Sequence, residues 1–154
     1  MRVVVGGTFG VLHRGHRALL SRAFGIGDYV CIGLTTDAYV HRVKGTYGIP
    51  SYDERRDALE GFATGLGKSF EIVPIDDRFG PATRENFDAI VVSEETQAAA
   101  LEINAVRQSV GLNPLRIDVV AFVLADDAVP ISTTRILVGE IDPEGHLLHG
   151  KDHA

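Results

Sequence analysis

Two glycines and two histidines near the start of the chain have types and a spacing suited to phosphate chemistry. The stretch VVVGGTFGVLHRGH, residues 3–16, places Gly6 and Gly7 after an apolar run and sets His13 and His16 three residues apart. Glycines let backbone amides approach a ligand closely, and a following helix would direct its N-terminal amides and positive dipole at an anion. Histidines at this spacing in a first helical turn project from one face. The stretch therefore predicts a phosphate site.

Two other interpretations of the histidine pair are open. A catalytic zinc site needs a third protein ligand, and the neighbouring sequence offers no obvious one. A structural role, with the glycines in a turn and the histidines solvated or capping a helix, explains the glycines alone equally well. The sequence contains neither the dinucleotide fingerprint G-x-G-x-x-G nor the Walker loop G-x-x-x-x-G-K-S/T.

A second group of phosphate-binding side chains lies towards the end of the chain. The stretch PISTTRI, residues 130–136, offers the hydroxyls of Ser132, Thr133 and Thr134 at the start of a predicted short helix, where backbone amides are also free. Arg135 adds a forked cation that suits phosphate oxygens. Alone, this group is better explained as an ordinary helix cap. Paired with the histidine stretch, it predicts a second clamp that suits a triphosphate.

The elements that must position these residues alternate along the chain. Apolar, β-branched runs predict strands at 2–6, 28–34, 70–75, 87–93 and 115–123. Helical patterns are expected at 14–25, 51–66, 94–110 and 132–138. The second of these helices opens with Ser51 and Glu54 at capping-box spacing. Strands that are apolar on both faces and separated by helices indicate one doubly wound, Rossmann-like α/β domain with a five-stranded parallel sheet, which binds ligands at the carboxyl ends of its strands.

Composition and charge narrow the classes of function. The 154 residues suffice for one domain, and the net charge of −6 argues against broad binding to nucleic acid or to an anionic membrane. The single cysteine, Cys31, excludes an internal disulfide and fits a small core residue. The sequence shows neither a signal peptide nor an apolar run near the ~18 residues of a membrane-spanning helix. We therefore expect a soluble, cytoplasmic protein.

Four stretches resemble the motifs of one enzyme family. The nucleotidyltransferase signature G-S/T-F-x-x-x-H-x-G-H is similar to GGTF and HRGH here, and the I-S-S-T-R-I motif of that superfamily is similar to PISTTRI. The D-D-x-F/Y-G-P loop and the V-S-x-E-T…I-N-x-x-R helix of archaeal and eukaryotic-type phosphopantetheine adenylyltransferases resemble residues 71–82 and 90–107. This resemblance covers nearly the whole chain up to GEID. It implies adenylyl transfer from ATP to 4'-phosphopantetheine, which gives dephospho-coenzyme A and pyrophosphate in coenzyme A synthesis.

The resemblance also implies roles for single residues. The acceptor phosphate would be held by Gly6, Gly7, Thr8 and Phe9. The ATP phosphates would be held by His13, His16 (nearest the α-phosphate), Ser132, Thr133, Thr134 and Arg135. Lys44, in the loop expected at 42–48, would be a second cation at the α-phosphate, although most lysines are simply solvated. Because the attacking phosphate is already an anion, catalysis needs alignment and charge stabilisation rather than a strong general base.

The remaining implied site residues lie in the middle of the chain. Asn104 and Arg107, three apart on one helix face, would reach the ribose and a phosphate, and an ordinary surface helix explains them equally well. Asp76 and Asp77 would position the acceptor rather than bind metal, because Mg²⁺ with ATP is held largely by phosphates and water. The expected partners are ATP with Mg²⁺ and 4'-phosphopantetheine, with no nucleic acid and no membrane. The oligomeric state is open, and we favour a monomer.

Two features fall outside the motifs. Many family members carry an acidic residue where this chain has Gly10, so the task of that carboxylate is missing or relocated. Residues 146–154, after an expected domain at 1–145, form a polar tail in which His146, His149 and His153 could bind a divalent metal. A solvated tail is the commoner outcome, so we expect its removal to leave activity intact.

Two alternative functions remain. One is a sister enzyme, such as a glycerol-3-phosphate cytidylyltransferase or an FMN adenylyltransferase, because the two end motifs do not distinguish ATP from CTP. The DDRFGP loop disfavours this alternative. The other is a non-catalytic nucleotide sensor, which the presence of His16, Lys44 and Arg135 disfavours.

Overall fold

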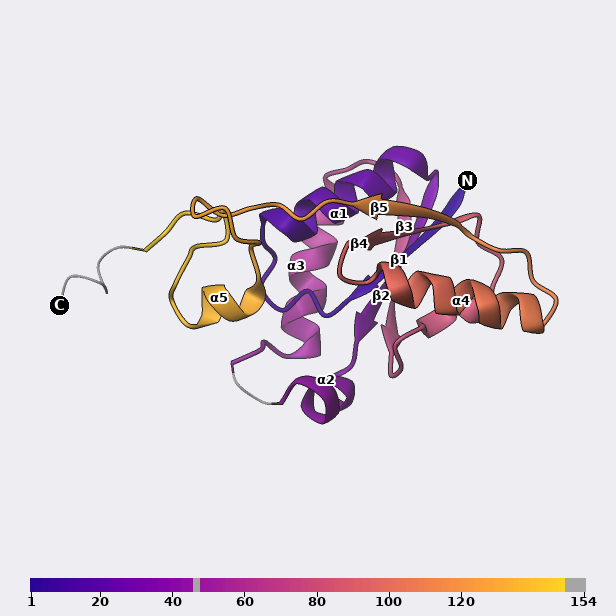
Figure 1. The fold of residues 1–154 in the computed structure, drawn as a ribbon, viewed down its shortest axis with the longest axis horizontal. Helices are drawn as coiled ribbons and strands as arrows, with labels where there is room; N and C mark the ends of the chain where they lie inside the picture. The colour runs from indigo at the N-terminus through magenta and orange to yellow at the C-terminus, as the bar shows by residue number, and fades with distance from the viewer. Residues whose placement is uncertain (46–47, 149–154) are drawn as a thin grey trace.

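A five-stranded parallel sheet organises the part of the chain that the structure describes. The structure is a computed structural model, and it describes residues 1–45 and 48–148. Its strands are β1 (Arg2–Gly7), β2 (Tyr29–Thr35), β3 (Ser69–Ile75), β4 (Ala89–Ser93) and β5 (Arg116–Val120). Their order is β3-β2-β1-β4-β5, and each neighbouring pair is parallel. The expected doubly wound α/β fold is confirmed, and its strand order reverses between β1 and β4 (Figure 1).

Helices bury both faces of the sheet. They are α1 (Arg14–Ile26), α2 (Asp37–Lys44), α3 (Tyr52–Thr64), α4 (Gln97–Ser109) and α5 (Thr133–Leu137), with a short 3₁₀-helix, η1, at Gly80–Thr83. Because successive strand residues point to opposite faces, Val3 and Val5 pack with side chains of α1 and α3, whereas Val4 packs with side chains of α4 and η1. Within residues 1–45 and 48–148, none of the helices has the length and apolar composition needed to cross a membrane.

Every expected element is present, and each end lies within three residues of its expected position. The capping box predicted for α3 is confirmed, since the Ser51 hydroxyl accepts from the Glu54 amide and the Glu54 carboxylate accepts from the Ser51 amide. Two elements were not expected, α2 and η1. The first of these changes the position of a predicted site residue.

The placement of Lys44 in a loop is wrong, because Lys44 is the last residue of α2. The helix begins after Thr36, whose hydroxyl accepts from the Tyr39 amide at 3.2 Å. Val40 alone among the residues of α2 is buried, so the helix lacks the apolar stripe that reveals a helix in a sequence. The expected loop also includes residues 46–47, which lie outside the described residues.

After β5, the chain runs past the carboxyl end of the sheet to α5, close to the start of α1 (Figure 1). Ala125, Ile131 and Ile141 form a small buried cluster there, and Leu147 packs against it. The amide of Arg14 in α1 donates to the Pro143 carbonyl at 2.9 Å. The segment after β5 is therefore hydrogen-bonded to the first residue of α1. The expected domain boundary at residue 145 stays a prediction, and residues 149–154 lie outside the described part.

Candidate active site

A cavity of about 500 Å³ opens at the carboxyl ends of β1, β4 and β5. Its wall comes from the segment after β1, the end of α2, the ends of β4 and β5, and the start of α5. A second cavity of about 250 Å³ lies towards β2, η1 and α4. Both cavities are lined by Gly6, Gly7, Thr8, Lys44 and Thr96. Two ligands, one in each cavity, would therefore meet at the end of β1.

His13 and His16 lie in the wall of the larger cavity and close the N-terminus of α1. Nδ1 of His13 accepts from the amides of Gly15 at 3.0 Å and His16 at 3.3 Å, and Nδ1 of His16 accepts from the His13 amide at 3.3 Å. With Nδ1 used as an acceptor, each neutral ring carries its hydrogen on Nε2. The capping interpretation is thus correct, and it leaves each ring one N–H donor for a ligand.

Burial keeps both imidazoles neutral. It is the largest cause that lowers the pKa of His13 from 6.5 to about 4, and the charge of Arg17 lowers it further. The pKa of His16 is lowered to about 3, first by burial and then by the neighbouring His13. The two rings are stacked with centroids 3.6 Å apart. At neutral pH the pair therefore offers hydrogen bonds, not positive charge, to a phosphate.

Phe9 fixes the shape of the loop between β1 and α1. It has a left-handed backbone, with φ of 48°, and its ring is buried against Gly7 and the His16 ring, whose centroid is 5.1 Å away. A Cβ on Gly7 would lie 3.1 Å from Phe9 Cε2, so a larger residue there would press on the ring and require it to shift by a few tenths of an ångström. Phe9 lines the larger cavity without a polar side chain. Its contribution is to hold His16.

Gly10 lets α5 pack against the same loop. A Cβ at this position would lie 2.9 Å from Cγ2 of Thr133, and the Val11 amide donates to Thr133 Oγ1 at 3.4 Å. Any side chain in place of Gly10 would therefore displace Thr133. Glycine at position 10, where many family members carry an acidic residue, is thus coupled to the position of Thr133 in the second predicted phosphate clamp.

The structure brings most of the predicted phosphate ligands to the larger cavity. Besides the loop and the two histidines, its wall contains Lys44, Ser132, Thr133 and Thr134. The hydroxyl of Ser132 caps α5 by accepting from the Arg135 amide at 3.2 Å, so the helix-cap interpretation of this residue is confirmed. Thr133 and Thr134, the first two residues of α5, line the same cavity as the histidines.

Three predicted nucleotide ligands do not reach either cavity. The Arg135 guanidinium donates to the Val129 and Pro130 carbonyls and pairs with the carboxylates of Asp127 and Glu140. The side-chain amide of Asn104 bonds both backbone groups of Leu115. Arg107 donates to the carbonyls of Ala82, Glu85 and Asn113. Its surface interpretation is wrong, because only 1% of Arg107 is exposed.

The two aspartates of the DDRFGP loop have separate positions. Asp77 lines the smaller cavity, and its carboxylate accepts from the amides of Phe79 at 3.0 Å and Gly80, which begins η1. Asp76 accepts from the Thr36 hydroxyl and lines neither cavity. Asp77 is therefore the member of the pair that shapes the predicted acceptor side.

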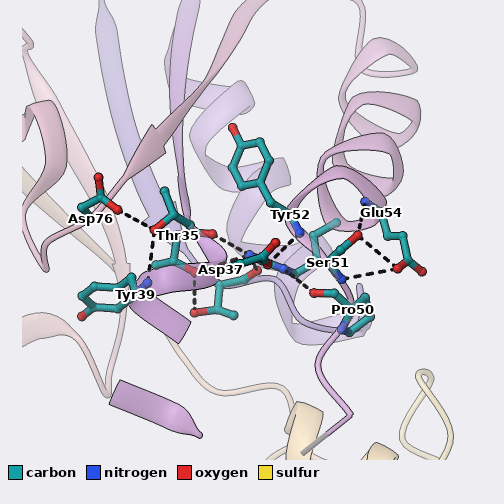
Figure 2. Close-up of polar contacts among 11 residues, drawn as sticks. Thr35, Asp37, Tyr39, Pro50, Ser51, Tyr52, Glu54 and Asp76 are labelled. Atoms are coloured by element: carbon teal, nitrogen blue, oxygen red, sulfur yellow. Dashed lines mark hydrogen bonds and ion pairs between the residues drawn. The ribbon is translucent and has the colours of Figure 1, made fainter. Parts of the chain in front are cut away.

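Sequence reasoning missed a buried cation behind the site. Arg55 of α3 is 2% exposed, and its guanidinium bonds the carbonyls of Thr8, Thr35 and Pro50 and the carboxylate of Asp37. Figure 2 shows Thr35 and Asp37, from the stretch that joins β2 to α2, close to Pro50, which precedes α3. In the sequence Arg55 stands among charged helix residues, YDERRD, which carry no signal that one of them is buried.

The donor set of the larger cavity fits a metal that arrives with the nucleotide. Among the residues that the structure describes, Glu95 is the one carboxylate that lines the cavity. In the described part of the chain, no group of three or more His, Cys, Asp and Glu side chains is placed to hold a metal ion. Mg²⁺ in nucleotide sites keeps several waters and binds phosphate oxygens, so it needs few protein ligands here. His149 and His153 of the tail lie outside the described residues, so the possible tail metal site remains a prediction.

The fold, together with this pair of cavities, defines the class of protein. Residues 4–138 match the cytidylyltransferase-like family, which is a family of nucleotidyltransferases. A phosphopantetheine adenylyltransferase from Methanothermobacter thermautotrophicus is 45% identical over 147 residues, which cover 95% of this chain and 88% of that protein. The chain therefore belongs to the phosphopantetheine adenylyltransferase family, as its motifs suggested.

One further relative supports this placement, and one solved structure supports the fold. A bifunctional phosphopantetheine adenylyltransferase/NTP phosphatase from Thermoplasma volcanium is 49% identical over 96% of this chain, but the chain spans only 45% of that protein's length. A crystal structure of a protein with unknown function from Archaeoglobus fulgidus has a TM-score of 0.71 and 31% identity over 78% of this chain and 89% of that one.

Proposed function

We propose that this protein transfers the adenylyl group of ATP to 4'-phosphopantetheine, giving dephospho-coenzyme A and pyrophosphate in coenzyme A synthesis. The observation that carries the proposal is the meeting of two cavities at the end of β1, where both share Gly6, Gly7, Thr8 and Lys44. The reaction joins two phosphates, so it needs two adjoining sites with donors at their junction. Relatives named for this activity support the choice of substrates.

The larger cavity would hold ATP. Its wall presents the Nε2–H groups of His13 and His16 from one side and the hydroxyls of Ser132, Thr133 and Thr134 from the other. The smaller cavity has an apolar wall that includes Ile75, Phe79 and Ile103, which suits the uncharged arm of the acceptor. Its phosphate would lie against the amides of Gly6 to Phe9 and the Thr8 hydroxyl, next to the α-phosphate of ATP.

The acceptor phosphate attacks the α-phosphorus of ATP, an oxygen–phosphorus bond forms, and the bond to pyrophosphate breaks. No proton has to leave the nucleophile, because a phosphate monoester is already an anion at neutral pH. His16 donates a hydrogen bond and Lys44 adds positive charge to the transferring phosphoryl group, where negative charge must be stabilised. Mg²⁺ would enter as part of the nucleotide substrate, neutralising phosphate charge.

The roles of Arg135, Asn104, Arg107 and Asp76 as ligand-binding residues remain predictions. In the structure their polar groups bond protein partners. A cytoplasmic location and a monomeric state are part of the proposal, and gel filtration with light scattering tests the latter.

A substrate panel tests the function directly. Purified protein with Mg²⁺ is offered ATP or CTP together with 4'-phosphopantetheine, glycerol-3-phosphate, FMN or nicotinamide mononucleotide, and pyrophosphate release is followed. We expect ATP with 4'-phosphopantetheine to be turned over fastest, and the reverse reaction to proceed with pyrophosphate. Faster turnover of another pair would move the protein to a sister activity. Binding of ATP without turnover of any pair would support a nucleotide sensor instead.

A further inference from the structure

Thr35 and Arg55 lie directly behind Thr8, the residue to which the proposed function gives the acceptor phosphate. Thr35 is the last residue of β2, and it is 5% exposed. Its hydroxyl donates to Thr8 Oγ1 at 3.0 Å. Nη1 of Arg55 lies 2.8 Å from the Thr35 carbonyl, 3.0 Å from the Thr8 carbonyl and 3.4 Å from Thr35 Oγ1. The three residues therefore form one hydrogen-bonded chain.

The chemistry of these groups gives the chain a direction. A guanidinium carries only donors, so Thr35 Oγ1 must accept from Arg55. A hydroxyl has one hydrogen, and that of Thr35 is directed at Thr8 Oγ1. Thr8 Oγ1 is thereby an acceptor on its buried side. Its own hydrogen is free to point into the space that both cavities share.

The position of Arg55 is itself fixed by the surrounding segments. Nε donates to the Pro50 carbonyl at 2.9 Å, and Nη2 pairs with the carboxylate of Asp37 at 3.1 Å. The same carboxylate accepts from the Tyr52 amide at 2.9 Å (Figure 2). Since these bonds leave the guanidinium no freedom to turn, its donors face Thr8 and Thr35 permanently. Asp37 is the first residue of α2, the helix that ends with Lys44.

We propose that Thr35, held by Arg55, is a positioning residue that orients the Thr8 hydroxyl as a hydrogen-bond donor to the phosphate of the acceptor substrate. The proposal rests on the proposed function, because it takes the bound anion to be the acceptor phosphate. A donor oriented before binding does not have to give up another partner when the phosphate arrives, so its hydrogen bond contributes more to affinity. The effect should be confined to ligands that carry this phosphate.

Two substitutions of Thr35 separate this role from packing. Thr35→Val keeps the shape of the buried side chain and removes the hydroxyl, whereas Thr35→Ser keeps the hydroxyl and removes the methyl group. Isothermal titration calorimetry measures the Kd of 4'-phosphopantetheine, of pantetheine without the phosphate, and of ATP. Urea unfolding of each variant records its stability separately.

We expect Thr35→Val to raise the Kd of 4'-phosphopantetheine by about 5-fold, less than for loss of a whole hydrogen bond to a charged group, because the Thr8 hydroxyl remains but is no longer oriented. The Kd values of pantetheine and ATP should stay within about 2-fold of the wild type. Thr35→Ser should bind all three ligands like the wild type. Thr8→Val should show a larger loss of the same selectivity, about 10-fold, because it removes the donor itself, and the Thr8→Val/Thr35→Val double variant should lose nothing more than Thr8→Val.

Equal affinity of the wild type and Thr35→Val for 4'-phosphopantetheine would overturn the proposal. So would a loss common to all three ligands, or a greater loss in Thr35→Ser than in Thr35→Val, because either would indicate packing. The substrate panel distinguishes failure of the proposed function from failure of the role of Thr35. Turnover of ATP with 4'-phosphopantetheine, combined with an unaffected Thr35→Val variant, removes only the role of Thr35. A wild type that binds pantetheine and 4'-phosphopantetheine equally overturns the acceptor site and the role of Thr35 together.

Discussion

At the scale of single residues, each histidine of HRGH combines a structural task, which the structure shows, with the chemical task that we propose for it. Nδ1 closes the start of α1 and Nε2–H is left for the ligand. This division explains why a neutral ring suits the site, since a charged imidazolium could not accept the amide hydrogens that Nδ1 now accepts. Burial enforces the neutral form by lowering the pKa of His16 to about 3.

Substitution of His16 tests its share in catalysis. Because the hydrogen bond that we propose from His16 to the transferring phosphoryl group would be strongest in the transition state, His16→Ala should lower kcat by about 100-fold while the Kd of ATP changes little. His16→Gln is the matched variant, because glutamine at this position can preserve the capping box without an imidazole. Steady-state kinetics and ATP calorimetry check both. Near-normal turnover in His16→Ala would contradict the role of His16, whereas His16→Gln, which keeps an N–H donor, shows whether the imidazole itself is needed.

At the scale of elements, the His13 cap makes the stability of α1 depend on pH. The pKa of His13 is about 4 in the folded protein and 6.5 in the unfolded chain. Between these values the unfolded chain binds a proton that the folded protein excludes, so the free energy of unfolding should fall as the pH falls from 6.5 to 4. Above pH 6.5 this contribution is fully present.

Urea unfolding of the wild type and of His13→Asn between pH 4.5 and 7 measures this dependence. Asparagine caps helices well, so the variant should keep the start of α1 and lose part of the pH slope. His41→Asn is the control, since it removes an exposed histidine of α2 and should retain the wild-type slope. Identical slopes in the wild type and His13→Asn would show that His13 does not carry the effect.

Helices and strands could be predicted from the sequence where their buried residues form a regular pattern or where a cap marks their start. The strands and α1, α3 and α4 have apolar patterns or caps that a sequence displays, and their predicted positions were correct. Helix α2 was not predicted, because its single buried residue, Val40, cannot produce a periodic pattern of apolar residues. Arg55 and Arg107 were not recognised as buried because their partners are backbone carbonyls brought close only by the fold. Which charged residues fill such positions depends on tertiary contacts that no local pattern records.

At the scale of the whole molecule, the site is assembled at the reversal of strand order from segments far apart in the chain. The loop after β1 supplies the histidines, while residues 131–134 supply the hydroxyls that face them. Motif recognition located both segments, but it could not show that Gly10 and Thr133 touch. The C-terminal cluster includes Ile131, which also lines the larger cavity, so the stability of this cluster should affect the shape of that cavity.

Two truncations can therefore locate the last residue of the C-terminal segment that activity requires. Leu147 packs against the cluster of Ala125, Ile131 and Ile141, and the Leu148 amide donates to the Glu140 carbonyl at 3.1 Å. Deletion after Leu148 removes none of these contacts, so kcat and the KM of ATP should stay within about 2-fold of the wild type.

The sequence alone predicts the same for deletion after Gly145. The contacts of Leu147 predict a different result for deletion after Gly145, namely a raised KM of ATP. This deletion removes Leu147, so Ile131 and the adjoining hydroxyls lose support. Leu147→Ala in the full chain should reproduce part of that change. Unaltered kinetics after both deletions would place the functional boundary at residue 145, and loss of zinc together with activity after deletion beyond Leu148 would instead indicate a metal site in the tail.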